Sequence, residues 1–187
     1  MKLDFYNRVL DFAKTHKKIA EQIKELKHVN SKSLLDVGGG SGLLTHYLED
    51  EFEKIIIVEP SKSMTNHITN SSVTIINSII QNWKSKDKFD TVVCFDSLHH
   101  VANEYKDGFE EVKNAILKMI DNAENEVIII EPRMNSLSGF WIKVQENWIL
   151  KMGSYFMSKN EFRDVLEEYN YSIYEYKQFI IVHIKLK

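Results

Sequence analysis

An apolar run near the start of the chain ends in an acidic residue and then in a cluster of glycines. Its residues are Leu34-Leu35-Asp36-Val37-Gly38-Gly39-Gly40-Ser41-Gly42. The glycines leave a turn with almost no side chains, where the backbone can approach a ligand closely. A leucine-rich segment with helical spacing follows. We therefore expect a buried strand that leads into a helix through a ligand-binding turn.

A second apolar run ends in an acidic residue further along the chain. The run Ile55-Ile56-Ile57-Val58 stops at Glu59. An acidic residue about 20 residues after such a glycine turn can reach the ribose hydroxyls of a nucleoside lying over it. The glycine turn and Glu59 together predict a ligand that contains a nucleoside.

The glycine spacing discriminates between such ligands. A dinucleotide turn reads G-x-G-x-x-G, but Leu43 stands where the third glycine should be. The G-x-x-x-x-G-K-[ST] pattern of nucleoside triphosphate loops is also absent from the sequence. The chain instead reads Asp-x-Gly-x-Gly-x-Gly from Asp36 to Gly42. This pattern resembles the first motif of class I S-adenosylmethionine-dependent methyltransferases, in the small-molecule branch called type 11.

The resemblance extends from Ser31 to the C-terminus and implies S-adenosyl-L-methionine as cofactor. In this family the glycine turn binds the methionine end of the cofactor. Its residues in this chain are Asp36, Gly38, Gly40 and Gly42. Glu59 would bind both ribose hydroxyls, because its two carboxylate oxygens face two donors. Ser61 and Met64 stand where family members pack against the adenine.

One position departs from the family pattern. Family members usually place an aspartate after the third strand, where it bonds to the adenine amino group. Ser78 occupies that position here, between Asn77 and Ile79. Either Asn77 or Ser78 could accept the bond, or the backbone of Ile79 could contribute. We expect all three residues to lie at the adenine.

Three residues after the fourth expected strand are candidates for catalysis: Asp96, His99 and His100. Ligands of open parallel sheets bind beyond the carboxyl ends of the strands, and in the family this passage faces the reactive methyl. A histidine there could accept a proton from the acceptor. Alternatively, one histidine caps a helix or packs near the cofactor while the other faces solvent. Methyl transfer to a good nucleophile then needs mainly alignment.

The elements that position these residues form an α/β pattern. Near-continuous apolar strands are expected at 33–38, 54–59, 73–77, 91–95 and 127–131, with helices between them. Such runs are typical of a parallel sheet covered on both faces. One or two helices precede the first strand, a polar helix starts at Pro60-Ser61, and another covers 106–120.

The C-terminal part has a different pattern. A helix after a cap at Ser158 precedes two apolar runs at 173–176 and 179–186. So short a connection can form only an antiparallel hairpin. We predict an α/β fold, a Rossmann-like three-layer sandwich whose seven-stranded sheet has five parallel strands plus a C-terminal antiparallel hairpin. The methyltransferase family has the same sheet.

The chain is expected to form a single domain over 1–187. Residues 132–157 are too aromatic for a solvated loop and too long for a simple connection. In the family this insertion covers the substrate together with N-terminal helices. We expect a helical cap at 1–30 and a lid at 132–157. Aromatic lid residues, such as Trp141, predict an apolar or aromatic small-molecule acceptor or a partner surface. The alternative is core packing or a dimer contact, so a homodimer stays open.

Composition points away from several other classes. The net charge of −3 gives no reason to expect nucleic acid or a membrane surface as partner. Lys14, Lys17 and Lys18 do cluster, but they share a helical pattern with Glu21 and Glu25, which indicates a solvated helix face.

The single cysteine, Cys94, lies in an apolar run, where a packing role is expected. With no secretory signal and no apolar stretch of membrane-spanning length, we predict a cytoplasmic protein. No metal is expected, because no ligand cluster is apparent and the adjacent His99 and His100 should point in different directions on a helix.

We predict an enzyme that transfers a methyl group from S-adenosylmethionine to a small-molecule acceptor by direct displacement. One alternative is a catalytically inactive S-adenosylmethionine-binding protein that acts as a regulator or partner subunit. Another is a protein or RNA methyltransferase, against which the acidic balance argues. A nicotinamide-dependent oxidoreductase is the least favoured. The sequence does not identify the acceptor, because unrelated chemistries share this sheet.

Overall fold

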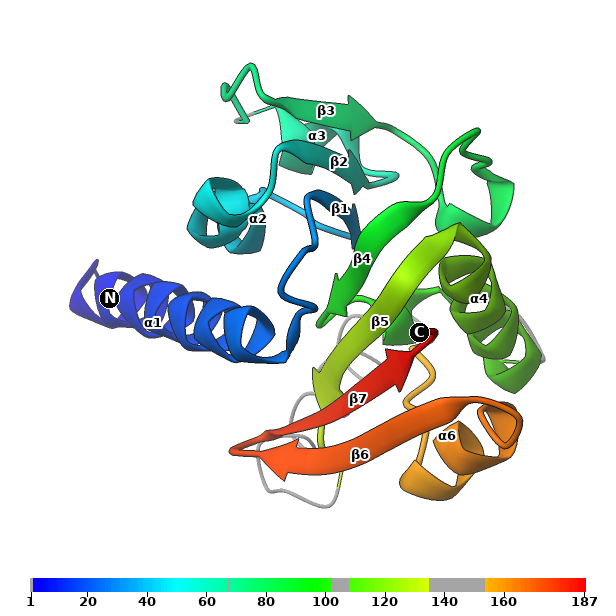
Figure 1. Ribbon diagram of the computed structural model, residues 1–187. Helices are drawn as coiled ribbons and strands as arrows, with labels where there is room; N and C mark the ends of the chain where they lie inside the picture. The colour runs from blue at the N-terminus through cyan, green and yellow to red at the C-terminus, as the bar shows by residue number, and fades with distance from the viewer. Residues whose placement is uncertain (1, 67, 102–107, 135–153) are drawn as a thin grey trace.

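The computed structural model describes residues 2–66, 68–101, 108–134 and 154–187, with side chains from Lys14 onward (Figure 1). The helices are α1 (Lys2–Leu26), α2 (Leu43–Leu48), α3 (Lys62–Thr65), α4 (Gly108–Asn122) and α6 (Lys159–Val165). The strands are β1 (Ser33–Val37), β2 (Lys54–Val58), β3 (Val73–Ile76), β4 (Phe89–Phe95), β5 (Ala123–Pro132), β6 (Asn170–Tyr176) and β7 (Phe179–Lys185). Short 3₁₀ turns cover Glu49–Glu51, Ile80–Asn82 and Leu98–His100.

The strands form one seven-stranded sheet in the order β3-β2-β1-β4-β5-β7-β6. The first five strands are parallel, and β7 pairs antiparallel with both β5 and β6. This confirms the predicted sheet of five parallel strands and a C-terminal antiparallel hairpin. The two-residue connection between β6 and β7 requires this reversal, since a parallel crossover needs a dozen or so residues.

Two helical layers cover the sheet, because alternate residues of each buried strand point to opposite faces. Leu34 of β1 and Val93 of β4 pack in a cluster with Ile19 and Ile23 of α1. The neighbouring strand residues pack with α4 and α6 on the other face. Figure 1 shows α1 and α2 on one side of the sheet and α4 and α6 on the other. The predicted three-layer sandwich is therefore present.

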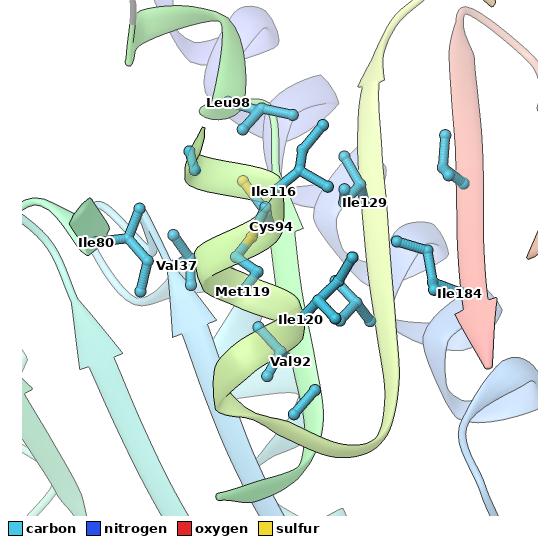
Figure 2. Close-up of a cluster of buried hydrophobic side chains, with 14 of the residues drawn as sticks. Val37, Ile80, Val92, Cys94, Leu98, Ile116, Met119, Ile120, Ile129 and Ile184 are labelled. Atoms are coloured by element: carbon cyan, nitrogen blue, oxygen red, sulfur yellow. The ribbon is translucent and has the colours of Figure 1, made fainter. Parts of the chain in front are cut away.

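The α4 side of the sheet holds the larger apolar cluster. Figure 2 shows Ile116 and Met119 of α4 over the strands that carry Cys94 and Ile129, and all four side chains are fully buried. Cys94 thus has the packing role expected from the sequence, and burial raises the pKa of its thiol well above the ordinary range. Burying each such side chain contributes roughly 1.5–3 kcal/mol, so this cluster anchors β4 beneath the helix.

The strand order indicates where a ligand can bind at the carboxyl ends of the strands. The chain runs outward from β1 through β2 to β3 and then returns to the other side of β1 as β4. The order therefore reverses between β1 and β4, and ligands of such sheets bind at the carboxyl ends of the strands at this point. The glycine turn follows β1 and Asp96 follows β4, so both lie at this position.

The structure modifies several predicted boundaries. The N-terminal segment forms one helix, α1, where one or two were expected. The helix predicted from Pro60-Ser61 begins later, at Lys62, because Ser61 has an extended backbone and its amide is held by Glu59. Ser158 caps α6 as predicted, in a capping box with Glu161.

The predicted helix over 106–120 is α4, whose described part begins at Gly108. Residues 135–153, which contain Phe140, Trp141 and Trp148 of the predicted lid, lie outside the described residues. Within the described ranges, no helix has the length and hydropathy needed to span a membrane.

Candidate functional site

The turn between β1 and α2 depends on glycine at three positions. Gly38, Gly40 and Gly42 have φ angles of 70°, 54° and 75°, in the left-handed region that side chains disfavour. A Cβ atom at Gly38 would also lie 1.7 Å from Ser97 Oγ. The alternating glycines of the sequence motif are therefore the residues that need this backbone freedom, and they allow the turn to pass close to the segment after β4.

Glu59 is bonded to that turn. The residue is 7% exposed, and its Oε2 accepts a hydrogen bond from the Gly40 amide at 3.2 Å. Its Oε1 accepts a hydrogen bond from the Ser61 amide at 2.8 Å. Each oxygen has a second lone pair for a further donor. The carboxylate thus links the ends of β1 and β2 and can still accept two ligand hydroxyls.

A cavity of about 110 Å³ lies against the glycine turn. Its walls include Asp36, Gly38 to Gly40, Met64, Phe95 and Asp96. The described residues that line it include carboxylates but neither lysine nor arginine. Such a cavity favours a cationic ligand over a phosphate, because the carboxylates attract positive charge and repel negative charge.

Asp36 is almost fully buried within β1, where its Oδ2 accepts a hydrogen bond from Thr45 Oγ1 at 2.6 Å. Burial raises the pKa of this carboxyl to about 6, the Thr45 hydrogen bond opposes the rise, and the nearby charge of Glu59 adds to it. The carboxyl thus titrates in a mildly acidic range and can respond to a positive charge in the cavity.

Two of the predicted adenine contacts are exposed apolar side chains. Met64 is 47% exposed and Ile79 is 44% exposed, while most other large apolar side chains in the described ranges are buried. Met64 follows β2 and lines the cavity, and Ile79 follows the adjacent strand β3. Met64 therefore presents an apolar surface to the cavity.

The predicted polar contacts of the adenine, Asn77, Ser78 and Ser61, form different hydrogen bonds. Asn77 donates through Nδ2 to the Glu59 carbonyl at 3.2 Å and to Thr65 Oγ1 at 3.3 Å. The Ser78 hydroxyl donates to the Ile79 carbonyl at 3.0 Å. Ser61 precedes α3, and its hydroxyl lies 2.9 Å from that of Ser63. The bonds to Nδ2 orient the Asn77 side-chain amide, with its nitrogen towards Glu59 and Thr65.

The three predicted catalytic residues lie on one short passage, but in different environments. Asp96 lines the cavity and has a φ angle of 52°, a left-handed conformation that aspartate tolerates better than most residues. His99 is 2% exposed, whereas His100 is half-buried. Neither histidine is among the described residues that line the cavity. The structure therefore brings only Asp96 directly to the glycine turn.

The expectation that His99 and His100 point in different directions is wrong. Their ring centroids lie 4.0 Å apart. The residues form a 3₁₀ turn, and Phe156 stacks on the His99 ring with a centroid distance of 4.5 Å. His100 Nδ1 lies 3.3 Å from Ser154 Oγ. The described end of the predicted lid therefore packs against this histidine turn.

Glu131, at the end of β5, organises the same turn. Its Oε1 accepts hydrogen bonds from the Ser97 amide at 3.0 Å and the Leu98 amide at 2.9 Å. Its Oε2 lies 2.5 Å from His99 Nδ1, and both side chains are buried. One carboxylate thus fixes two backbone amides and a ring, which determines where the passage after Asp96 runs.

Sequence reasoning assigned no site role to Glu131 or to His16. His16 is 8% exposed, lines the cavity and packs edge-on against Phe95 with a centroid distance of 5.0 Å. The sequence does contain signals for both. Glu131 ends an apolar run as Glu59 does, and His16 lies between Phe12 and Ile19 at helical spacing.

These features define a class of protein. A doubly wound sheet, a glycine turn at the point of strand reversal and an acidic residue after β2 form a Rossmann-like site for a cofactor that contains a nucleoside. The carboxylates of the cavity and the missing third dinucleotide glycine distinguish this site from one for a pyrophosphate.

The sequence identifies the family within this class. Residues 11–176 match a family model described as a methyltransferase domain. The chain therefore belongs to the methyltransferase domain family, and the predicted family is confirmed. No curated protein matches the chain significantly.

Solved structures share the whole fold. A S-adenosylmethionine-dependent methyltransferase from Clostridium acetobutylicum is 13% identical with a TM-score of 0.70, covering 98% of this chain and 97% of its own. The magnesium protoporphyrin IX methyltransferase of Synechocystis, solved with bound S-adenosylmethionine, is 16% identical with a TM-score of 0.67, covering 95% and 81%. The plantazolicin methyltransferase BpumL, in complex with a monoazolic desmethylPZN analog and S-adenosylhomocysteine, is 14% identical with a TM-score of 0.69, covering 100% of this chain and 89% of its own. At these identities the likeness establishes the fold.

Proposed function

We propose that this methyltransferase takes its methyl group from S-adenosylmethionine and transfers it to a small-molecule acceptor. The observation that carries the proposal is the glycine turn held by the Glu59 carboxylate, beside a cavity walled by Asp36 and Asp96. Solved relatives of this fold that bind S-adenosylmethionine or its product support the choice of cofactor.

The residues present fit this cofactor chemically. S-adenosylmethionine has an ammonium and a sulfonium, and Asp36 and Asp96 supply negative charge where such groups would lie. Glu59 offers one lone pair on each oxygen to the ribose hydroxyls, and the turn of Gly38, Gly40 and Gly42 leaves room for the methionine end. A dinucleotide would place its pyrophosphate beside these carboxylates, which argues against a nicotinamide enzyme.

The adenine would lie over the exposed side chains of Met64 and Ile79. We assign its amino group to the carbonyl oxygen of Asn77, because the Asn77 Nδ2 is already bonded to Glu59 and Thr65. Ser61 and Ser78 would border this position. Apolar contact on both faces of a ring with one oriented acceptor at its edge is a common way to bind a base.

When bound, S-adenosylmethionine supplies a methyl group already activated by the sulfonium, so the protein has mainly to align the acceptor. Asp96 is placed to orient the acceptor, since it lines the cavity after β4. We assign His100 as the group that takes a proton when the acceptor requires it, because its ring is half-buried beside Ser154. His99, buried and bonded to Glu131, positions this turn.

The N-terminal segment 1–30 and the insertion 132–157 are proposed to enclose the acceptor. His16 of α1 lines the cofactor cavity, and Phe156 of the insertion packs on the histidine turn. Both segments therefore touch the position where the acceptor would lie, and excluding water there protects the aligned pair from competing reactions.

Turnover tests the proposal directly. The protein is incubated with S-adenosylmethionine labelled in its methyl group and a small-molecule metabolite extract, and label is followed into new products. We expect S-adenosylhomocysteine and a labelled product, with little label transferred by Asp96→Asn. Tight cofactor binding without any product would favour an inactive regulatory or partner protein. In a parallel incubation with added protein and RNA, label appearing only in these macromolecules would favour a macromolecular acceptor.

A further inference from the structure

A second cavity lies beside the cofactor cavity, between α1 and the turn that joins β6 to β7. Its volume is about 240 Å³. The lining residues from α1 include Lys14, Thr15, Lys18 and Ile19, and those from the hairpin include Lys177 and Phe179. The cavity therefore combines three lysines with an apolar floor, since Ile19 and Phe179 are buried.

The charge of this cavity contrasts with that of the rest of the molecule. The chain has a net charge of −3, but the described residues that line the cavity include no carboxylate. The nearest acidic residue on β6, Glu175, pairs with Arg133 and Lys159. Three ammonium groups around one hollow raise the local concentration of anions and favour binding of a negative group.

The sequence indicated a solvated helix face for Lys14, Lys17 and Lys18, and the structure divides this cluster. Lys14 and Lys18 are one helical turn apart and line the cavity, whereas the described lining does not include Lys17. Lys177 comes from the far end of the chain, and its ammonium lies 4.9 Å from the Tyr176 ring centroid. The fold thus brings together Lys18 and Lys177, which are 159 positions apart in the sequence. The helical pattern alone does not place them together.

Contacts between aromatic rings connect residues that line this cavity with residues that line the cofactor cavity. His16, which lines the cofactor cavity, directly follows Thr15 of the second cavity. The Phe95 ring packs against His16 at 5.0 Å and against Phe179 at 5.4 Å, in edge-to-face geometry. Phe179 pairs with Pro132 at the carboxyl end of β5, so this side of the second cavity lies at the same end of the sheet as Asp96.

We propose that the methyl acceptor carries an anionic group, a carboxylate or a phosphate, that binds between Lys14, Lys18 and Lys177. The apolar part of the acceptor would then lie along the aromatic side chains of His16, Phe95 and Phe179, with its nucleophile towards Asp96. This inference rests on the proposed methyltransferase function and adds a requirement for negative charge on the substrate.

Binding of small anions tests the site without knowledge of the acceptor. Benzoate and phenyl phosphate are titrated by calorimetry into the protein saturated with S-adenosylhomocysteine, which distinguishes a carboxylate from a phosphate. The variants are Lys18→Gln, which keeps most of the side-chain stem, and Lys177→Asn, which suits the φ angle of 54° at that position. Lys17→Gln is the matched control on the same helix.

We expect the double variant Lys18→Gln/Lys177→Asn to bind the anion roughly tenfold more weakly or worse, equivalent to about 1.4 kcal/mol. The control should bind as the unchanged protein does, and all variants should bind S-adenosylhomocysteine equally. Equal anion affinity in the double variant and the control would overturn the inference, as would the absence of anion binding to the unchanged protein. Failure to bind S-adenosylhomocysteine would instead refute the proposed function.

A turnover experiment gives a second readout. The metabolite extract is divided into anionic and remaining fractions by ion exchange, and each is offered with labelled S-adenosylmethionine. We expect the labelled product in the anionic fraction, with the double variant raising the KM for this fraction and leaving the affinity for S-adenosylhomocysteine unchanged. A product formed only from the non-anionic fraction would contradict the charge requirement while supporting methyl transfer.

Discussion

Glu59 is the residue on which the cofactor site depends most directly. Its two oxygens hold the amides of Gly40 and Ser61 and are the proposed acceptors for two ribose hydroxyls. We expect Glu59→Gln to weaken S-adenosylhomocysteine binding by roughly 10- to 100-fold, because a hydrogen bond to a charged group contributes about 1.5–3 kcal/mol. Calorimetric titration measures this change.

The control for this substitution is Glu53→Gln. Glu53 is an exposed residue whose carboxylate pairs with Lys32, so the same chemical change there should leave the affinity unaltered. An unchanged affinity in Glu59→Gln would show that the ribose is bound elsewhere.

Asp36 predicts a dependence of stability on pH. Burial raises its pKa to about 6 in the folded protein, above the ordinary value of 3.8. Protonation therefore stabilises the fold fully below the unfolded value, and this contribution is lost as the pH rises through about 6. Asp36→Asn, which mimics the protonated form, should be more stable than the unchanged protein at neutral pH by up to about 3 kcal/mol.

Urea unfolding of both proteins across the acidic to neutral range measures this difference. It should shrink as the pH falls, since the unchanged protein becomes protonated. Asp36→Asn should also bind S-adenosylmethionine more weakly at neutral pH, because a negative charge facing the cationic cofactor is lost. A constant stability difference at every pH would contradict the raised pKa.

The histidine turn is the element whose position controls the acceptor side of the site. Glu131 binds the amides of Ser97 and Leu98 through one oxygen and His99 through the other. In Glu131→Gln the carbonyl oxygen can keep the two amide bonds, but the new NH₂ faces His99. The turn should therefore stay in place while the histidines lose their orientation.

We expect Glu131→Gln to lower kcat by roughly 10-fold or more, because catalytic groups that lose their alignment with the acceptor lose rate. Its affinity for S-adenosylhomocysteine should be nearly unchanged, since Glu59 and the glycine turn are intact. Glu124→Gln, at an exposed position on the same strand as Glu131, is the control. Equal loss of kcat and of cofactor affinity would show that Glu131 only supports the fold.

At the same scale, the sequence predicted the elements well and the contacts between them only in part. The apolar runs and the short connection before the last strand were sufficient to predict the seven strands. Strands that are buried on both faces need apolar residues along most of their length. The glycine pattern predicted a turn that the φ angles confirm. The roles of His16 and Glu131 were missed because each acts on a residue far away in the sequence, Phe95 or His99. Periodicity within one segment does not encode such pairs.

At the scale of the whole molecule, the carboxyl ends and the amino ends of the parallel strands contain different groups of polar residues. The carboxylates that line the cavity at the glycine turn lie towards the carboxyl ends of the parallel strands, while the amino ends contain a buried network around Glu126. Glu126 Oε1 accepts hydrogen bonds from the His28 amide at 2.7 Å and from Thr91 Oγ1 at 2.8 Å. Its Oε2 lies 2.9 Å from His183 Nε2. One carboxylate thus joins the loop after α1 to β4, β5 and β7.

This division predicts that stability and cofactor binding can be separated. Burial alone would raise the pKa of Glu126, but the hydrogen bonds from His183, His28 and Thr91 outweigh burial and lower it. The ionised carboxylate therefore stabilises the fold above its ordinary pKa of 4.5, and this stabilisation is lost as the pH falls through the lowered value.

Glu126→Gln should remove about 3 kcal/mol of stability at neutral pH, because a hydrogen bond to a charged group contributes about 1.5–3 kcal/mol and the amide cannot keep all the bonds that the carboxylate accepts. The corresponding fall in Tm is about 6–12 °C for a chain of this size. Glu124→Gln, at the exposed pair with Lys187 on the same strand, should change Tm little. At a temperature where all variants are folded, S-adenosylhomocysteine should bind each with the same affinity, because the network lies at the opposite end of the sheet from Glu59. Weaker binding by Glu126→Gln would show that the two ends are energetically coupled through the strands.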